Sequence, residues 1–186
     1  MKKALRLHTP LTGEICTGLR TGDVVLLSGI VITARDVAHR RICEAINRGD
    51  EPPVSLKGET IFYAGPTPAP PSRVIGSIGP TTSGRMDIYT PTLLEAGLKG
   101  MIGKGKRSSA VRESIRQNHA VYFGAMGGVA ALLSQCVTAV EMIAYEDLGT
   151  EAIRRLDIVD FPLIVINDIE GRDLYEMVMI GNDHLY

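Results

Sequence analysis

The chain has 186 residues, which is long enough to bury a hydrophobic core without disulfides or metals as staples. Hydrophobic residues make up 45% and charged residues 22%, a balance typical of globular proteins and not of disordered or fibrous ones. The formal net charge of −1 argues against electrostatic binding of nucleic acid or of acidic membranes. We therefore expect a single domain over residues 1–186, with neither nucleic acid nor a membrane as its partner.

The cysteines and the N-terminus bear on the cellular compartment. Cys16, Cys43 and Cys136 lie far apart, without the Cys-x-x-Cys spacing of zinc sites, redox pairs or self-contained clusters. An odd number of thiols is typical of a reducing cytoplasm. The initial Met-Lys-Lys is not followed by the apolar segment of a secretory signal. We expect a cytoplasmic protein with no metal site of its own.

Residues 120–140 contain no charged residue and are long enough in principle to cross a bilayer. Three glycines, together with Ser134, Gln135 and Thr138, interrupt the segment. A strand, a glycine-rich turn and a short buried helix explain this composition better than a membrane span does.

Apolar stretches of strand length alternate with segments of helical period, which indicates an α/β fold. Residues 23–32 predict the first strand. Thr33 then predicts the N-cap of a helix that runs to Gly49 and holds Arg35 in its first turn. The further expected strands are residues 60–64, 74–78, 101–102, 120–123, 137–144 and 163–166. The further expected helices run from the N-cap Thr90 to Gly100, from Ser108 or Ser109 through Ile115, and over residues 148–156.

The turn at residues 79–85, GPTTSGR, is the first candidate binding element. It contains three hydroxyls and a guanidinium, between glycines that allow close backbone approach. Thr81 and Thr82 could hydrogen-bond a carboxylate, and Arg85 could form a bidentate pair with it. An ordinary capped turn with a solvated arginine explains the composition equally well.

Three other side chains are candidate ligand-binding or catalytic residues, and each also has a simpler structural explanation. Arg35 lies at a helix N-terminus, where the helix dipole favours anions and disfavours a cation. Its side chain is therefore either solvated or binds, together with the helix N-terminus, a single anion. Lys104 lies in a Gly-Lys-Gly-Lys segment that lacks the form of a phosphate-binding loop, and a solvated lysine is the alternative. His39 could act as an acid or base, or could simply lie on an amphipathic helix face.

A series of short motifs carries a family resemblance over nearly the whole chain. They are SG at 28–29, TARDxAH at 33–39, YxGP at 63–66, GPTTSxRMD at 79–87, MIGKG at 101–105 and YEDLGxEA at 145–152. In this order they resemble the beta subunit of class I fumarases and L(+)-tartrate dehydratases. The resemblance implies a single swivelling β/β/α domain. It also implies a partner, the alpha subunit, that carries a [4Fe–4S] cluster on its own cysteines.

The resemblance implies roles for five residues at the interface of the two subunits. Arg35, Arg85 and Lys104 would supply charge to a C4 dicarboxylate, and Thr81 and Thr82 would supply hydrogen bonds. Reversible hydration of fumarate to malate also needs a base beside a carboxylate. The family places a threonine like Thr81 in that role, and a neutral Lys104 is the physical alternative.

The implied function is half of a hydro-lyase site, inactive without the partner, in a hetero-oligomer. L(+)-tartrate dehydratase is an alternative, because its substrate differs from malate by one hydroxyl and few contacts need change. A non-catalytic dicarboxylate-binding module is a further alternative, although all five key residues are present.

Overall fold

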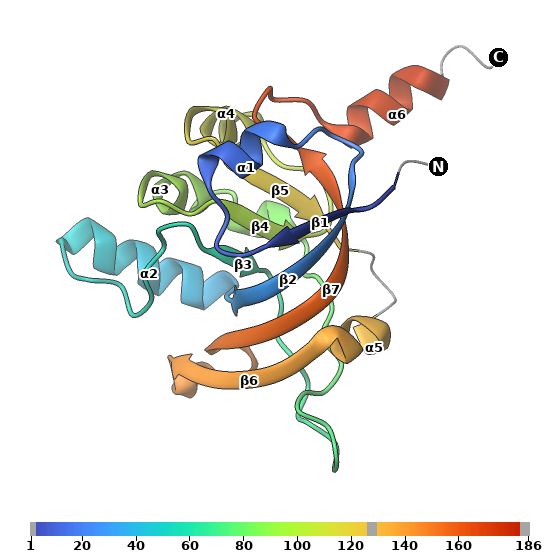
Figure 1. Ribbon diagram of the computed structural model, residues 1–186. Coiled ribbons are helices and arrows are strands. Elements are labelled where there is room, and N and C mark those ends of the chain that lie inside the picture. The colour runs from blue at the N-terminus through green and yellow to red at the C-terminus, as the bar shows by residue number, and fades with distance from the viewer. Residues whose placement is uncertain (1–2, 126–129, 183–186) are drawn as a thin grey trace.

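The computed structural model describes residues 3–125 and 130–182. Four parallel strands form its centre: β2 (Val24–Thr33), β3 (Thr60–Phe62), β4 (Gly100–Gly103) and β5 (Val121–Gly124). The long strand β7 (Ile153–Asn167) runs antiparallel to β5 and also to β2, so the sheet closes into a ring (Figure 1). Two strands extend the ring: β1 (Leu5–His8) pairs with β2, and β6 (Val137–Ala144) pairs with β7. The predicted α/β class is confirmed.

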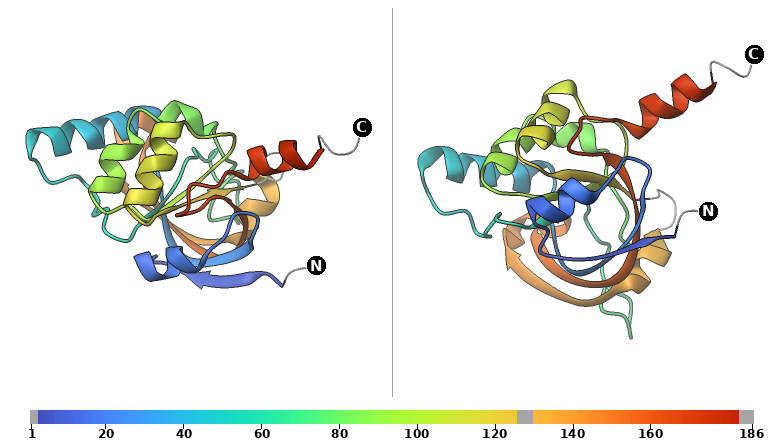
Figure 2. Two further views of the ribbon diagram at one scale, coloured as in Figure 1. Left: turned by 90° about the horizontal axis from the view of Figure 1, so that it is seen from above. Right: turned by 45° about the horizontal axis from the view of Figure 1, so that its top comes forward.

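Three helices cover the outer face of the parallel strands: α2 (Asp36–Arg48), α3 (Thr90–Glu95) and α4 (Ser109–Gln117). Figure 2 shows them side by side on one side of the sheet. The remaining helices are α1 (Gly13–Gly18), α5 (Ala130–Leu133) and α6 (Leu174–Asn182). Short 3-10 turns span Ser83–Met86, Ser134–Cys136 and Glu146–Glu151.

Alternation along the strands divides the buried side chains into two clusters. Phe62, Ile102 and Phe123 point into the ring, where Phe62 meets Phe161 edge-on at 5.5 Å between ring centroids. Their neighbours Met101 and Tyr122 point outward to the helices, as do other residues of these strands. The parallel strands are therefore buried on both faces, as the continuous apolar stretches predicted.

The start of α2 differs from its prediction. Thr33 does not cap the helix, because its hydroxyl accepts from the Arg154 amide at 3.1 Å and faces the Ala152 carbonyl. The N-cap is Arg35, and Asp36 is the first helical residue. The predicted end at Gly49 is confirmed: its φ of 78° closes the helix in the left-handed region.

Helix α3 was predicted one residue late at its start and five residues too long at its end. Its N-cap is Tyr89, and the Thr90 hydroxyl donates to the Met86 carbonyl at 2.8 Å within the first turn. The helix ends at Glu95, and Gly97 follows with a φ of 107°. By contrast, the Ser108 hydroxyl caps α4 as predicted and accepts from the Val111 amide.

Two predicted elements are wrong. Residues 74–78 form no strand, because this segment folds back on its own loop: the Thr67 amide donates to the Ser77 carbonyl at 3.0 Å. Residues 148–156 do not form the predicted helix: residues 148–151 end a 3-10 turn that is interrupted at Gly149, with φ 58° and ψ −111°, and β7 begins at Ile153. The last strand is far longer than predicted, since it has partners on both sides.

Three elements had no sequence prediction, namely β1, α1 and α6. The short helix expected within residues 120–140 is α5, but it is not buried as predicted, because only Leu133 of its residues is buried. Residues 126–129 of the glycine-rich turn lie outside the described residues. No helix in the described part of the chain has the length and apolar character needed to cross a membrane.

Candidate active site

The threonine turn and the lysine loop meet at the carboxyl edge of the parallel strands. The Thr81 amide donates to the Tyr63 carbonyl at 2.7 Å, just beyond β3. The Lys104 amide, just beyond β4, donates to the Thr81 carbonyl at 3.3 Å, and Thr82 and Lys104 form a parallel bridge. In open and closed parallel α/β sheets alike, ligands bind at the carboxyl ends of the strands, so two predicted elements lie where a site is expected.

Arg35 comes to the same edge from the end of β2. Its Nη1 lies 3.5 Å from the Thr81 hydroxyl, and its Nη2 donates to the Thr150 hydroxyl at 3.2 Å. Glu151 neutralises the guanidinium in part, with 3.7 Å between Nε and Oε1. Within residues 3–125 and 130–182, the buried Nε has no hydrogen-bond partner. The arginine is therefore held in place but retains capacity to donate.

Gly65 leaves the space that Arg35 occupies. A Cβ at this position would lie 2.5 Å from the Thr150 carbonyl oxygen and 3.1 Å from the Arg35 guanidinium carbon and Nε. The YxGP motif therefore has a steric reason: only glycine lets the loop after β3 pass this close to the arginine.

Arg85 is paired with Asp36, not with another predicted site residue. The pair is bidentate: Nε donates to Oδ1 at 2.9 Å, and Nη2 contacts Oδ2. Asp36 adopts a φ of 28°, which is strained for a residue other than glycine. Half of the Arg85 side chain stays exposed at 52%. Asp36 therefore aims this guanidinium, which the sequence did not reveal.

Thr82 and Lys104 are exposed, and Thr81 is partly buried. Over the described residues, the Lys104 ammonium forms no ion pair. The structure thus brings Arg35 to Thr81, and Thr82 to Lys104, with Arg85 on the same 79–85 turn. Hydroxyl and cationic groups therefore lie along a single edge, an arrangement suited to an anionic ligand.

The buried guanidinium of Arg107 contacts residues that pack behind this edge. Arg107 is 5% exposed and donates from Nε to Asp87 and from Nη2 to the Thr90 hydroxyl, both at 2.7 Å. It also lies over the rings of Tyr63 and Tyr122, at 5.4 and 4.9 Å from their centroids. Sequence reasoning missed it, because Arg107 follows two exposed lysines and resembles part of a solvated basic loop.

His39 lies beneath the site and is fully buried against the Tyr63 ring, 5.1 Å away between centroids. Burial, then the charge of Arg107, lowers the pKa of His39 to about 3. Neither ring nitrogen has a partner in the described structure. The histidine is therefore neutral near pH 7 and packs as part of the core, which favours the helix-face interpretation.

Within the described residues, the donor set does not fit a metal cluster. Among the described residues, no group of three or more His, Cys, Asp or Glu side chains could hold a metal ion. Cys16 and Cys43 are buried, and burial raises the pKa of each thiol to about 11. Ligation requires thiolates, which this environment disfavours.

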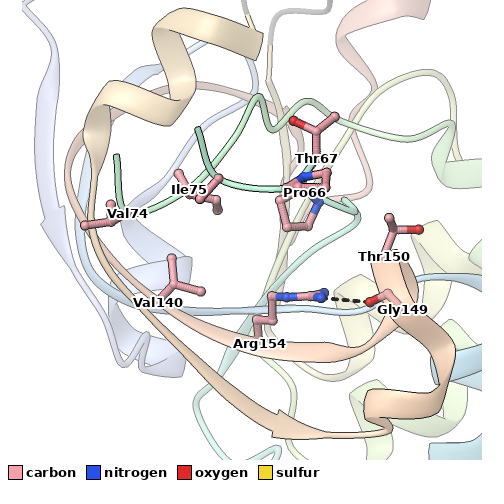
Figure 3. Close-up of a pocket in the computed structure, with 10 residues that line it drawn as sticks. Pro66, Thr67, Val74, Ile75, Val140, Gly149, Thr150 and Arg154 are labelled. Atoms are coloured by element: carbon pink, nitrogen blue, oxygen red, sulfur yellow. Dashed lines mark hydrogen bonds between the residues drawn. The ribbon is translucent and has the colours of Figure 1, made fainter. Parts of the chain in front are cut away.

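A cavity of about 450 Å³ adjoins the site and shares Thr150 with the Arg35 contacts (Figure 3). Its walls are largely apolar, including Pro66, Val74 and Val140. The Arg154 guanidinium enters it and donates to the Gly149 carbonyl at 2.8 Å. None of the five predicted site residues lines this cavity.

Comparison with known proteins places these features in a family. The family model described as Fumarase C-terminus matches residues 1–178. "Fumarate hydratase class I, aerobic" of Escherichia coli K12 is 36% identical over 156 residues, which cover 83% of this chain and 28% of that protein. "Fumarate hydratase 2" of Leishmania major is 36% identical over 160 residues, 85% of this chain and 28% of the relative.

A shorter relative matches almost end to end. "Putative L(+)-tartrate dehydratase subunit beta" of Methanocaldococcus jannaschii is 36% identical over 174 residues, which cover 90% of this chain and 89% of that protein. The chain thus spans between a quarter and a third of the fumarate hydratases named above. Because the family model matches nearly its full length and the relatives named above are 36% identical to it, the chain belongs to the fumarase C-terminus family.

Proposed function

We propose that this chain is the beta subunit of a class I fumarate hydratase, a hydro-lyase that interconverts fumarate and L-malate. The placement of Arg35 beside Thr81, and of Thr82 beside Lys104, at one sheet edge carries the proposal, and Arg85 lies on the same turn as the two threonines. Two carboxylates of a C4 acid need about this many donors. The relative that matches over 89% of its length bears the name subunit beta, which supports a separate chain.

The partner is an alpha subunit that bears a [4Fe–4S] cluster and completes the site, so the protein is a hetero-oligomer. The poor fit of this chain's own thiols supports a cluster held elsewhere. When bound on the partner, the cluster supplies a Lewis-acidic iron for the hydroxyl that is added or lost. We include in this proposal that the chain is a swivelling domain and that the protein is cytoplasmic.

The residues of this chain bind and orient the dicarboxylate and hold the cations that favour proton removal beside a carboxylate. Thr81 is the better supported base, because Arg35 Nη1 lies 3.5 Å from its hydroxyl and favours its ionised form. Lys104 is exposed on the loop after β4. Its ammonium is suited instead to holding a substrate carboxylate.

L(+)-tartrate dehydratase is the second candidate, because the relative matched almost end to end carries that name. The two substrates differ by a hydroxyl, which a few contacts can select. Anaerobic assay of the complex reconstituted with the cluster-bearing chain of the same organism separates the candidates. Turnover of malate and fumarate supports the first, and turnover of tartrate supports the second. Inactivity of a complex with an intact cluster rejects both.

The sharpest variant is Arg85→Met, which removes one charge from the proposed grip and keeps a side chain of similar length. We expect activity to fall by at least about 100-fold, while complex formation and thermal unfolding stay near the parent. Arg48→Met is the matched control, because Arg48 pairs with Asp50 on the exposed end of α2. Parent-level turnover in Arg85→Met contradicts the assigned role.

A further inference from the structure

A buried hydroxyl joins the two loops of the proposed site from behind. Tyr122, in β5, is fully buried, and its hydroxyl lies 2.9 Å from the Ser83 hydroxyl and 2.9 Å from the Gly105 carbonyl. A carbonyl oxygen can only accept, so the Tyr122 proton goes to Gly105 and Ser83 donates to Tyr122. Ser83 follows Thr82, and Gly105 follows Lys104. One phenol oxygen therefore ties the threonine turn to the lysine loop.

The end of β4 is shaped to admit the serine. A Cβ on Gly103 would lie 1.9 Å from the Ser83 hydroxyl oxygen and 2.9 Å from the Tyr63 ring. The Ser83 amide also donates to the Lys104 carbonyl at 2.9 Å. Any other residue at 103 would push Ser83 out of its place. The fit of Ser83 against a glycine is thus independent of the hydrogen bond to Tyr122.

Lys104 needs such support, because glycines flank it on both sides. Gly105 adopts a φ of 86°, in the left-handed region, and a chain of this kind has much conformational freedom when unrestrained. The Tyr122 hydroxyl holds Gly105 through its carbonyl, and the Tyr175 hydroxyl faces the Gly105 amide at 3.3 Å. Side chains supply the restraint that the sequence of the loop lacks.

The Tyr122 ring is itself fixed. The Arg107 guanidinium carbon lies 4.9 Å from its centroid, and Arg107 is anchored on Asp87. Burial raises the pKa of the Tyr122 phenol, so it stays protonated and can keep donating to Gly105. A phenol that does not ionise holds groups in place and does not exchange protons with a ligand.

We infer that Tyr122 and Ser83 are a positioning pair: their bridge sets the Lys104 ammonium against the Thr81 and Thr82 hydroxyls so that these groups can grip one carboxylate. The inference rests on the proposed function for what is gripped. Neither residue touches the ligand. Tyr122 and Ser83 act through the loops that carry Lys104 and Thr82.

The first test needs no substrate. Tyr122→Phe removes the bridging oxygen and keeps the ring, and Ser83→Ala removes the other hydroxyl. In the isolated chain we expect amide hydrogen exchange at Ser83 and Lys104 to speed up at least about tenfold in both variants. Tyr145→Phe is the matched control, because it removes a phenol oxygen from a ring that lies against Arg41 of α2. Unchanged exchange in both variants overturns the inference.

The second test uses the complex reconstituted with the cluster-bearing chain. We expect each variant to raise KM for malate at least about fivefold with a smaller change in kcat, and the double variant to lose no more than the worse single one. A merely structural role would lower Tm and leave KM unchanged, and that result overturns the inference. Faster amide exchange in the variants together with a KM equal to that of the parent also overturns the inference.

Failure of the proposed function has a different signature. If the parent complex converts neither malate nor tartrate, the role in gripping a substrate falls with the function. The exchange rates of the isolated chain still decide whether the bridge holds the two loops.

Discussion

Arg107 is a charge that the fold has taken into its interior. Its side chain is fully buried, while its partner Asp87 keeps 16% exposure. A second carboxylate contact links Asp87 to the Ser108 amide at 2.6 Å, which joins the 79–87 segment to the start of α4. Loss of such a buried partner leaves the remaining groups without compensation, which costs far more than loss of a surface pair.

Arg107→Met should therefore lower the free energy of unfolding by about 3–5 kcal/mol, because Asp87 and Thr90 lose their donor in a buried place. Arg6→Met is the control: Arg6 pairs with Asp160 at the surface, with 70% of its side chain exposed, and should cost less than about 1 kcal/mol. Urea titration of both variants measures the difference. Equal losses would show that Arg107 contributes no more than a surface charge.

His39 predicts a pH dependence of stability. Its pKa is about 3 in the folded chain and near the ordinary 6.5 when unfolded, so the unfolded state binds the extra proton between these values. Stability from this group is complete above pH 6.5 and is lost as the pH falls towards 3. The slope approaches about 1.4 kcal/mol per pH unit in the middle of that window.

The measurement is urea unfolding at pH 7, 6 and 5 for the parent and for His39→Leu. The parent should lose stability more steeply than the variant below pH 6, since only the parent has the buried imidazole. Parallel curves would mean that the imidazole takes up its proton in the folded chain.

At the scale of elements, the loops after the strands hold the site, and glycines decide how closely they approach. Gly65→Ala should displace Arg35, because the new Cβ would stand 2.5 Å from the Thr150 carbonyl and 3.1 Å from the guanidinium. We expect dicarboxylate affinity of the reconstituted complex to fall by about tenfold or more, measured as KM.

Gly18→Ala is the matched control for this variant. Gly18 ends α1, and a Cβ there would meet no heavy atom of the described chain within 4 Å. Its KM should equal that of the parent. A parent-like KM in Gly65→Ala would show that the loop can move aside at little cost.

Local patterns predicted the elements that local interactions form. Helices α2 and α4 have clear apolar periodicity, and their caps Gly49 and Ser108 lie where predicted. The start of α2 was misplaced because Thr33 bonds to residues 152 and 154, more than a hundred positions away. The sequence does not distinguish a threonine that caps a helix from one that hydrogen-bonds to a distant strand. The same holds for residues 74–78, whose apolar side chains serve a loop.

The prediction of the five site residues became specific because their motifs occur in the order of a known family, and not because of composition. Composition alone left Arg35, Arg85 and Lys104 as solvated side chains or ligands. The structure adds what the motifs cannot state: Asp36 grips Arg85, and Arg107 supports the edge from a position 20 residues beyond Asp87. Partners of this kind are set by the crossing of loops, which no local pattern encodes.

The architecture depends on one long strand, β7. Its 15 residues pair with β2 at nine positions and with β5 at its far end. Sequence reasoning found only residues 163–166 of it, because its polar first half reads as an amphipathic helix. Pairing with three strands at once, and not the propensity of its residues, makes this segment extended.

Closure by β7 also has a bearing on how the protein behaves at high concentration. In the ring, each of the strands β2, β3, β4 and β5 has a partner strand on both sides. Within the described residues, only β1 and β6 end the sheet, and they carry Arg6 and Glu141. Charged outer strands discourage the edge-to-edge pairing that starts aggregation. The same strand that shapes the fold thus leaves few templates on which misassembled fibres could grow.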